Sequence, residues 1–154
     1  DDRTRRRTDW QMVGLLNPFR LAVLKLHWTE PAWTSPLNYG DKSEGKFVCA
    51  LCGSALFDGS HKFESGSGWP SFWRTANDGC VELTPASKDF LGRTECHCAK
   101  CNGHLGHVFP DGPIKYGLVG PGESLPESDY KCTDATSLPR YCVNGLALRY
   151  KKDE

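Results

Sequence analysis

Hydrophobic residues occur in short runs over most of the chain, and turn-forming residues interrupt them. From residue 46 onward, five runs have the length and apolar content of strands: 46–49, 79–83, 93–98, 141–143 and 147–150. Clusters of Gly, Pro, Asn and Asp separate these runs, which is typical of antiparallel β structure. The pattern therefore predicts a mainly β fold.

The N-terminal part has a different pattern. Residues 1–9 are polar and rich in arginine, whereas residues 10–28 are rich in Leu, Val and aromatic residues. We predict a basic tail and then one short helix, with Asn17-Pro18 as a punctuation point. Residues 29–45 contain several Pro and Gly residues and indicate an extended connector. The predicted organisation is a tail and helix over 1–28 and one domain over 29–154, with a long surface loop at 119–139.

Composition and charge narrow the class of protein. The chain has 154 residues, which suits one domain. Lys and Arg together number 19, as do Asp and Glu, and this balance counts against broad electrostatic attachment to nucleic acid. No apolar run approaches the roughly 20 residues that span a bilayer. No cleavable secretory segment is visible, so the eight cysteines favour metal binding or redox chemistry over a disulfide framework.

Two C-x-x-C pairs predict a metal site. Cys49 and Cys52 form the first pair, and Cys98 and Cys101 form the second. Gly53 and Asn102, the residues that follow the pairs, tolerate positive φ angles, so each pair can lie on a tight turn. Four thiolates make the closed form of a structural Zn²⁺ site, in which the ion has no catalytic role. Two redox dithiols are the alternative. Cys96, on the same strand face as Cys98, could compete as a ligand.

Three further segments carry chemistry beyond that of a plain zinc module. Residues 65–72 place two glycines before Trp69, where a core aromatic turn is the simpler interpretation. His104 and His107 could be metal ligands, acid–base groups or structural residues, and a second metal would need a third ligand that the sequence does not identify. Arg140 lies two positions before Cys142 and would share its strand face, so it could stabilise a thiolate there. A buried, inert cysteine is the alternative.

Together these segments resemble the type B methionine sulfoxide reductases. The resemblance runs from about Thr29 to Tyr150. It rests on residues 29–33, both C-x-x-C pairs, and the segments 62–72, 93–95, 104–109, 111–113 and 140–144. It implies two antiparallel sheets with zinc at one end, and stereospecific, thiol-dependent reduction of methionine-(R)-sulfoxide, usually in proteins. Cys142 matches the catalytic cysteine, and Trp69 matches the aromatic residue that holds the substrate methyl group.

The resemblance also assigns the surroundings of Cys142. The polar lining is expected to comprise His104, His107, Asp111, Arg140 and Asn144, with Phe109 as a second substrate-binding residue. The thiolate would attack the sulfoxide sulfur, and His107 would supply the proton that the oxygen needs. Cys142 would then be a sulfenic acid, which a second thiol resolves before thioredoxin reduces the disulfide.

The chain departs from the family at the resolving thiol. Ser67 stands where many members have the resolving cysteine, and a serine cannot form a disulfide. Residues 119–139 are an insertion that contains Cys132, and we expect this loop to bring Cys132 to Cys142 at modest entropic cost. Cys96, Cys80 and direct reduction by an external thiol are the alternatives.

Two other functions could use a zinc-stabilised β domain of this kind. A non-catalytic, zinc-stabilised binding module could use the same scaffold, but it has no need for Arg140, Cys142 and Asn144 beside Trp69. A nucleic-acid-binding module is a third possibility, but only residues 3–7 of this chain are markedly basic, and such a module needs a larger basic surface. We expect a monomer that acts on oxidised proteins, uses thioredoxin and binds neither nucleic acid nor membrane. We place it in the cytoplasm, or in a mitochondrion or plastid if a targeting peptide is missing or partly retained.

Overall fold

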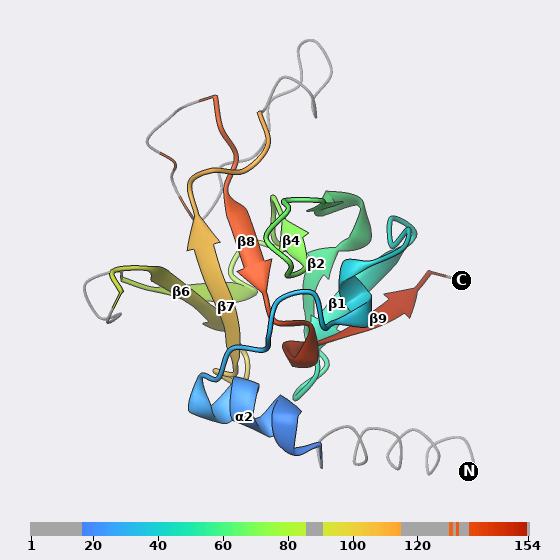
Figure 1. Cartoon of the computed structure of the whole chain (residues 1–154), viewed down its shortest axis with the longest axis vertical. Coiled ribbons are helices and arrows are strands. Elements are labelled where there is room, and N and C mark those ends of the chain that lie inside the picture. The colour runs from blue at the N-terminus through green and yellow to red at the C-terminus, as the bar shows by residue number, and fades with distance from the viewer. Residues whose placement is uncertain (1–16, 86–90, 115–129, 131, 133–135, 154) are drawn as a thin grey trace.

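The computed structural model describes residues 17–85, 91–114, 130, 132 and 136–153. Its strands form two antiparallel sheets, which confirms the predicted fold class (Figure 1). The smaller sheet has the strand order β2-β1-β9, and the larger has the order β3-β4-β8-β7-β6-β5. The strands are β1 (Gly45–Cys49), β2 (Ala55–Asp58), β3 (Lys62–Phe63), β4 (Ser71–Phe72), β5 (Val81–Thr84), β6 (Thr94–Cys98), β7 (His104–Phe109), β8 (Arg140–Val143) and β9 (Leu148–Lys152).

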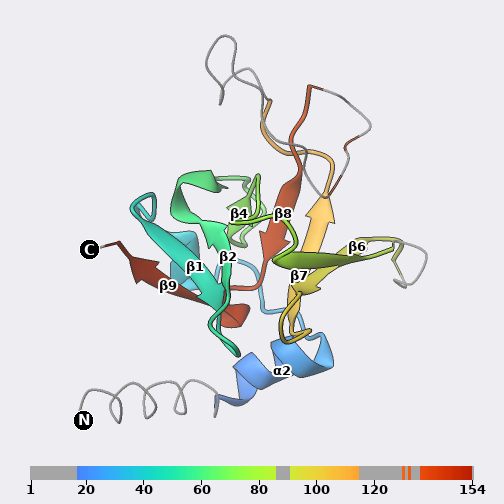
Figure 2. The same ribbon diagram turned by 180° about the vertical axis from the view of Figure 1, so that it is seen from behind.

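The predicted basic tail and residues 10–16 lie outside the described residues, whereas the C-terminal part of the predicted helical segment is helical, as α2 (Pro18–Leu26). The Asn17 side chain caps its first turn by accepting from the Phe19 N–H at 3.0 Å, and Pro18 provides a pre-set φ at the first helical position. Val23 and Leu24 are buried, and the helix lies across one end of both sheets (Figure 2). It ends at His27, which has a φ of 58°. In the described part of the chain, no helix has the length and apolar character that crossing a membrane would need.

Aromatic side chains join the two sheets. Phe47 and Phe57 are paired on neighbouring strands β1 and β2 of the smaller sheet. Phe72 of the larger sheet stacks on Phe57 with ring centroids 4.3 Å apart, and it meets Phe47 edge-on at 4.8 Å. All three rings are fully buried, so this cluster forms the centre of the core.

Three short 3-10 helices complete the described elements: η1 (Pro36–Asn38), η2 (Gly59–His61) and η5 (Gly145–Ala147). η5 carries the chain from β8 in the larger sheet to β9 in the smaller one. Arg20 of α2 donates to the carbonyl oxygens of Leu146 and Leu148 at 2.8 and 3.0 Å, and thereby ties the helix to this crossing.

The predicted connector and the predicted loop are each partly structured. The connector of residues 29–45 includes η1. Residues 119–135 of the predicted loop lie largely outside the described residues, apart from Tyr130 and Cys132. Its end is paired: Leu138 is buried and exchanges backbone hydrogen bonds with Gly112 and Pro113, and Ser137 bridges to Ile114. This pairing extends the β7–β8 ladder beyond the two strands.

Candidate active site

The four cysteines of the two C-x-x-C pairs meet at one end of the fold, as predicted. All four sulfur atoms lie within 4.8 Å of one another. The Cys49 and Cys101 sulfurs are 3.6 Å apart, as are those of Cys52 and Cys98. Sulfur atoms in a tetrahedral Zn–S₄ centre are separated by about 3.8 Å, given a Zn–S distance of about 2.3 Å. The group therefore fits a four-coordinate metal ion.

The two cysteine turns have the same backbone design. In the first, the Gly53 N–H donates to the Cys49 carbonyl and the Cys49 N–H donates to Ser54. In the second, Asn102 donates to Cys98 and Cys98 donates to Gly103 in the same pattern. Gly53 and Asn102 have φ angles of 77° and 62°, as the sequence indicated. A hydrogen bond between the thiols lowers the pKa of Cys98 and raises the pKa of Cys49.

Cys96 lies outside this group. Its side chain has no exposed surface and belongs to the hydrophobic core, and burial raises its pKa. Cys80 lies near the four-cysteine end, because Val81 pairs with Cys98 across β5 and β6. Its thiol donates to the Leu56 carbonyl at 3.6 Å.

Strand register builds the second site, on the larger sheet. Directly opposite residues across β6, β7, β8 and β4 are Glu95, His107, Cys142 and Ser71, in that order. Opposed residues in antiparallel strands project to the same face, so these four side chains form one row. The alternating burial of β8 places Arg140 and Cys142 on this face, and Tyr141 and Val143 in the core. The predicted shared face of Arg140 and Cys142 is confirmed.

A β-bulge brings both histidines to this face. Cys96 pairs with Gly106, whereas His97 pairs with His104, so Leu105 has no partner on β6. His104 and His107 therefore share a face although they are three positions apart, and their rings meet edge-on at 5.6 Å. Burial lowers the pKa of His104 to about 4.

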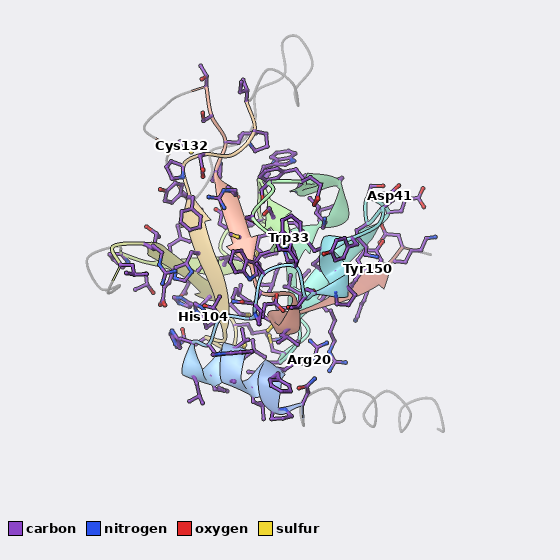
Figure 3. The ribbon with its side chains drawn as sticks, viewed as in Figure 1. Arg20, Trp33, Asp41, His104, Cys132 and Tyr150 are labelled. Carbon is purple, nitrogen blue, oxygen red and sulfur yellow. The ribbon has the colours of Figure 1, made fainter. Side chains whose placement is uncertain are left out.

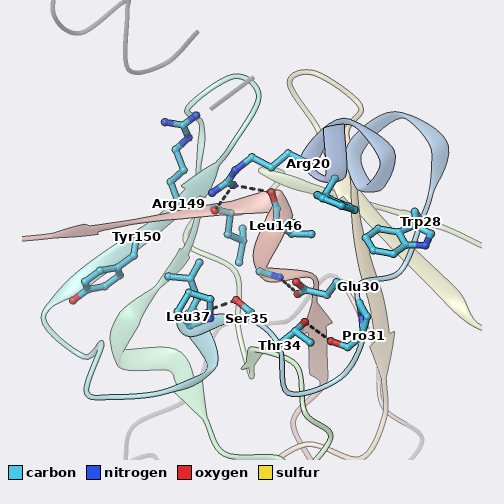
Figure 4. A pocket seen from close by; sticks show the side chains of 14 residues that line it. Arg20, Trp28, Glu30, Pro31, Thr34, Ser35, Leu37, Leu146, Arg149 and Tyr150 are labelled. Carbon is cyan, nitrogen blue, oxygen red and sulfur yellow. Dashed lines mark hydrogen bonds between the residues drawn. The ribbon is translucent and has the colours of Figure 1, made fainter. Parts of the chain in front are cut away.

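Cys142 lies in a cavity of about 270 Å³. Its lining includes most of the residues predicted for the site: Trp69, His107, Phe109, Arg140, Cys142 and Asn144. Thr29, Arg93 and Gly106 complete the lining. His104 and Asp111 lie outside this lining. A larger hollow of about 650 Å³ lies between α2 and β9, and its lining contains none of the predicted site residues (Figure 4).

Asp111 holds Arg140 at the mouth of the cavity. The Arg140 guanidinium donates to both carboxylate oxygens, through Nε at 3.0 Å and Nη2 at 3.2 Å. The hydrogen bond from Arg140 lowers the pKa of Asp111. The same guanidinium lies 4.3 Å from the centroid of the Phe109 ring. Arg140 is therefore fixed on two sides.

Hydrogen bonds to Glu30 fix another wall of the cavity. Trp69 Nε1 donates to the Glu30 carbonyl at 2.9 Å. The Asn144 amide is used twice: its oxygen accepts from the Glu30 N–H at 3.0 Å, and its nitrogen donates to the Leu105 carbonyl at 2.8 Å. The Glu30 carboxylate accepts from the Gly145 N–H (Figure 4). The amide of Asn144 therefore holds the backbone of this wall in place.

Ser67, which stands in the place of the family's resolving cysteine, and the candidate thiol Cys132 also lie toward this end. The Ser67 hydroxyl is 3.5 Å from the Cys142 sulfur. Cys132 lies beyond the ends of β7 and β8 (Figure 3). Burial raises the pKa of Tyr130, and the charges of Cys132 and Asp111 raise it further, so both groups lie within electrostatic reach of Tyr130.

Sequence reasoning did not assign a role to Thr29, Arg93 or Glu95, although it noted the segments that contain them. Glu95 joins the row only through the register of β6 with β7. The spacing of residues near Glu95 does not show which residue of β7 it will face, so only the family motif that contains Glu95 could have indicated its role.

Comparisons with known proteins identify the family of this chain. Residues 16–118 match the SelR domain family. The peptide methionine sulfoxide reductase MsrB of Leptospira interrogans is 39% identical over 145 residues, which cover 94% of this chain and 92% of the relative. The Bradyrhizobium diazoefficiens MsrB is 40% identical over 134 residues, which cover 87% and 81%. The Methanosarcina barkeri MsrB is 36% identical over 146 residues, which cover 95% and 86%. The chain belongs to the SelR domain family, which it shares with the MsrB peptide methionine sulfoxide reductases.

Proposed function

We propose that this protein reduces methionine-(R)-sulfoxide in peptides and proteins, with Cys142 as the nucleophile. The observation that carries the proposal is the placement of Cys142 in a cavity between His107 and Arg140, with Trp69 in the wall. A thiol on a strand among polar and aromatic side chains suits attack on an electrophilic sulfur.

The first step needs one proton. The Cys142 thiolate attacks the sulfoxide sulfur, and the sulfoxide oxygen passes to the cysteine as methionine leaves. One thiolate, one sulfoxide and one proton thus give one thioether and one sulfenic acid. His107 lies directly across the strand pair from Cys142 and is the candidate proton donor. Proton transfer by such a group contributes roughly 10²–10⁴-fold to a rate.

Aromatic side chains support recognition of the substrate. The Trp69 indole is held by its hydrogen bond to Glu30 and presents an apolar wall for the S-methyl group. Arg140 and Phe109 also line the cavity and contact each other through a cation–π interaction. Asp111 and Asn144 act through Arg140 and the Glu30 backbone, respectively, so we assign them positioning roles.

The four cysteines are proposed to hold Zn²⁺ as a structural ion. Their separations match a Zn–S₄ tetrahedron, which leaves no open position for a substrate. None of the four cysteines lines the Cys142 cavity. The ion would join the β1–β2 and β6–β7 turns and would take no part in the reaction.

A second thiol must return the sulfenic acid to the thiol state. Ser67 is close to Cys142 but cannot form a disulfide. Cys96 lies within electrostatic reach of Cys142, but it is fully buried in the core, and Cys80 lies toward the four-cysteine end. Cys132 lies at the active-site end and is the candidate we favour. Its attack on the sulfenic acid releases water, and thioredoxin would then reduce the disulfide. A monomer in a reducing compartment such as the cytoplasm meets these needs.

Reduction of a methionine-(R)-sulfoxide peptide with dithiothreitol tests the function. We expect the wild type to produce methionine, and Cys142→Ser to lose this activity while it keeps its metal and its thermal transition. Cys96→Ala is the matched control, because it removes a thiol from the same sheet outside the cavity. A folded, metal-loaded wild type without activity would overturn the proposal.

Disulfide mapping tests the resolving thiol. After one equivalent of substrate, we expect a peptide that links Cys132 to Cys142. Cys132→Ser should lose turnover with thioredoxin, and adding Ser67→Cys should restore it, because that position is close to the Cys142 sulfur. A link from Cys142 to Cys96 or Cys80 would contradict this assignment and leave the reductase activity intact.

A further inference from the structure

A second cluster of ligand-type side chains lies beside the row that contains Cys142. His27, Glu95 and His104 offer one ligand atom each, and these atoms all lie within 4.8 Å of one another. They come from the C-terminal end of α2, from β6 and from β7, respectively. The cluster is therefore a product of tertiary structure, and it contains no cysteine.

The distances between these ligand atoms are close to those found around a bound metal ion. Glu95 Oε1 is 3.3 Å from His27 Nδ1 and 3.9 Å from His104 Nδ1. Nitrogen and oxygen ligands lie about 2.0–2.2 Å from Zn²⁺, which places neighbouring ligand atoms about 3.4 Å apart in a tetrahedron. One of the three pairs already has this spacing, and a second must close by about half an ångström. The third pair, formed by the two histidine nitrogens, lies within 4.8 Å.

The His27 ring must turn to reach such an ion. The His27 and His104 rings are nearly parallel, with an interplanar angle of 15° and centroids 4.6 Å apart. A shared ion needs both ring planes to point at it. The His27 side chain is 55% exposed, so its ring has room to rotate.

His104 provides an independent observation. Its side chain is 1% exposed, and neither ring nitrogen has a hydrogen-bond partner. An unpaired buried polar group costs roughly 1–3 kcal/mol. Its Nδ1 faces the Glu95 carboxylate at a distance too long for a hydrogen bond but suitable for an intervening ion.

We propose that His27, Glu95 and His104 form a second metal site, which binds a divalent transition-metal ion of the zinc type. Two imidazoles and one carboxylate suit Zn²⁺ or Co²⁺ better than Mg²⁺ or Ca²⁺, which prefer oxygen ligands. Three protein ligands leave a position for water. The site uses only His104 of the histidine pair that the sequence indicates, and His27 and Glu95 complete its ligand set.

The site is next to the proposed catalytic residues but does not depend on them. Glu95 Oε1 also lies 3.9 Å from His107 Nε2. An ion at the cluster would hold the carboxylate that faces His107, so its occupancy is coupled to the active-site row. Binding itself requires no reductase activity, and failure of either proposal is therefore separable from failure of the other.

Metal titration of the zinc-loaded protein tests this proposal. With the four-cysteine site already filled, Co²⁺ and Zn²⁺ are added in turn and followed by absorption spectroscopy and calorimetry. We expect one further equivalent to bind. The Co²⁺ spectrum should show visible ligand-field bands without the strong thiolate charge-transfer band of a sulfur site.

Variants of the two accessible ligands identify the site. His27→Asn suits the left-handed backbone at this position, and Glu95→Gln keeps the side-chain shape. Each should weaken binding of the second equivalent by about tenfold or more. His97→Gln is the matched control, because His97 lies on the same strand as Glu95. It pairs with Glu82 of β5 at 3.2 Å and belongs to no three-ligand group among the described residues.

Three results would overturn the proposal. The first is the absence of a second bound equivalent in the zinc-loaded wild type. The second is unchanged affinity in both His27→Asn and Glu95→Gln. The third is a thiolate charge-transfer band for the added Co²⁺, which would assign it to a cysteine such as Cys80, Cys132 or Cys142.

Discussion

The two ends of this molecule are assembled by different rules. At the four-cysteine end, two turns with the same spacing and the same backbone hydrogen bonds face each other. At the Cys142 end, the side chains come from several strands and loops, and register brings them together. Local sequence therefore specifies the first site, whereas the second depends on the whole sheet.

The ends also differ in what holds their segments together. The proposed Zn²⁺ would join the two cysteine turns through four strong bonds. At the other end, hydrogen bonds do the corresponding work: Asn144 and the Glu30 carboxylate join the connector to the β8–η5 segment. Breaking one ligand should therefore affect stability at the first end, and breaking register should affect chemistry at the second.

The largest effect is expected from Cys98→Ser. This change removes one metal ligand, and structural metal binding contributes directly to folding. We expect loss of the metal and a decrease in the free energy of unfolding on the order of 5 kcal/mol or more. Elemental analysis and urea unfolding measure the two quantities.

Cys96→Ala is the matched comparison for that variant. Cys96 is two positions away on β6 and is equally buried, but it lies outside the cysteine cluster. It should keep the metal and lose only about 1 kcal/mol or less, because one sulfur atom leaves the core. A Cys98→Ser protein with full metal content and unchanged stability would show that the four-cysteine end needs no ion.

A medium effect is expected from Gly106→Ala, which acts on register. A Cβ atom at this position would lie 2.0 Å from the Cys142 carbonyl oxygen and 3.0 Å from the Val143 Cα atom. Strands β7 and β8 would have to separate where His107 faces Cys142. We expect a loss of roughly 1–3 kcal/mol in stability, a fall in kcat, and unchanged metal content. Unchanged kcat would mean that the His107–Cys142 register does not matter for the reaction.

The same contrast explains what the sequence could predict. The C-x-x-C turns follow from spacing and from residues that accept a positive φ, so Gly53 and Asn102 were identified in advance. The mainly β class follows from short apolar runs separated by turn residues. The strand β7 was not predicted, because the bulge at Leu105 breaks the alternation that identifies a strand.

The position of Cys142 was predictable only in part. The shared face of Arg140 and Cys142 follows from the period of a strand, and the structure confirms it. The contributions of Glu95 and His27 depend on strand register and on where α2 ends. These are set by packing of the whole chain, and no spacing within the sequence encodes them.

The smallest effect concerns the pH dependence of stability at the Cys142 end. Burial raises the pKa of Glu30 above its ordinary value, although the N–H groups of Gly145 and Leu146 oppose the change. The folded state therefore binds more protons than the unfolded state from about pH 4.5 up to the raised pKa. Within that window, stability should fall as pH rises, with a slope of at most about 1.4 kcal/mol per pH unit.

Glu30→Gln isolates this contribution, because glutamine keeps the shape of the side chain but does not titrate. Urea unfolding at a series of pH values should show that the wild type loses stability relative to the variant as pH rises through the window. The difference should become constant above the folded-state pKa of Glu30, where the group is ionised in both states. The opposite slope would mean that the hydrogen bonds from Gly145 and Leu146 affect the pKa of Glu30 more than burial does. The ionised carboxylate would then stabilise the fold. The difference between the two ends would then be smaller, since negatively charged side chains would hold both.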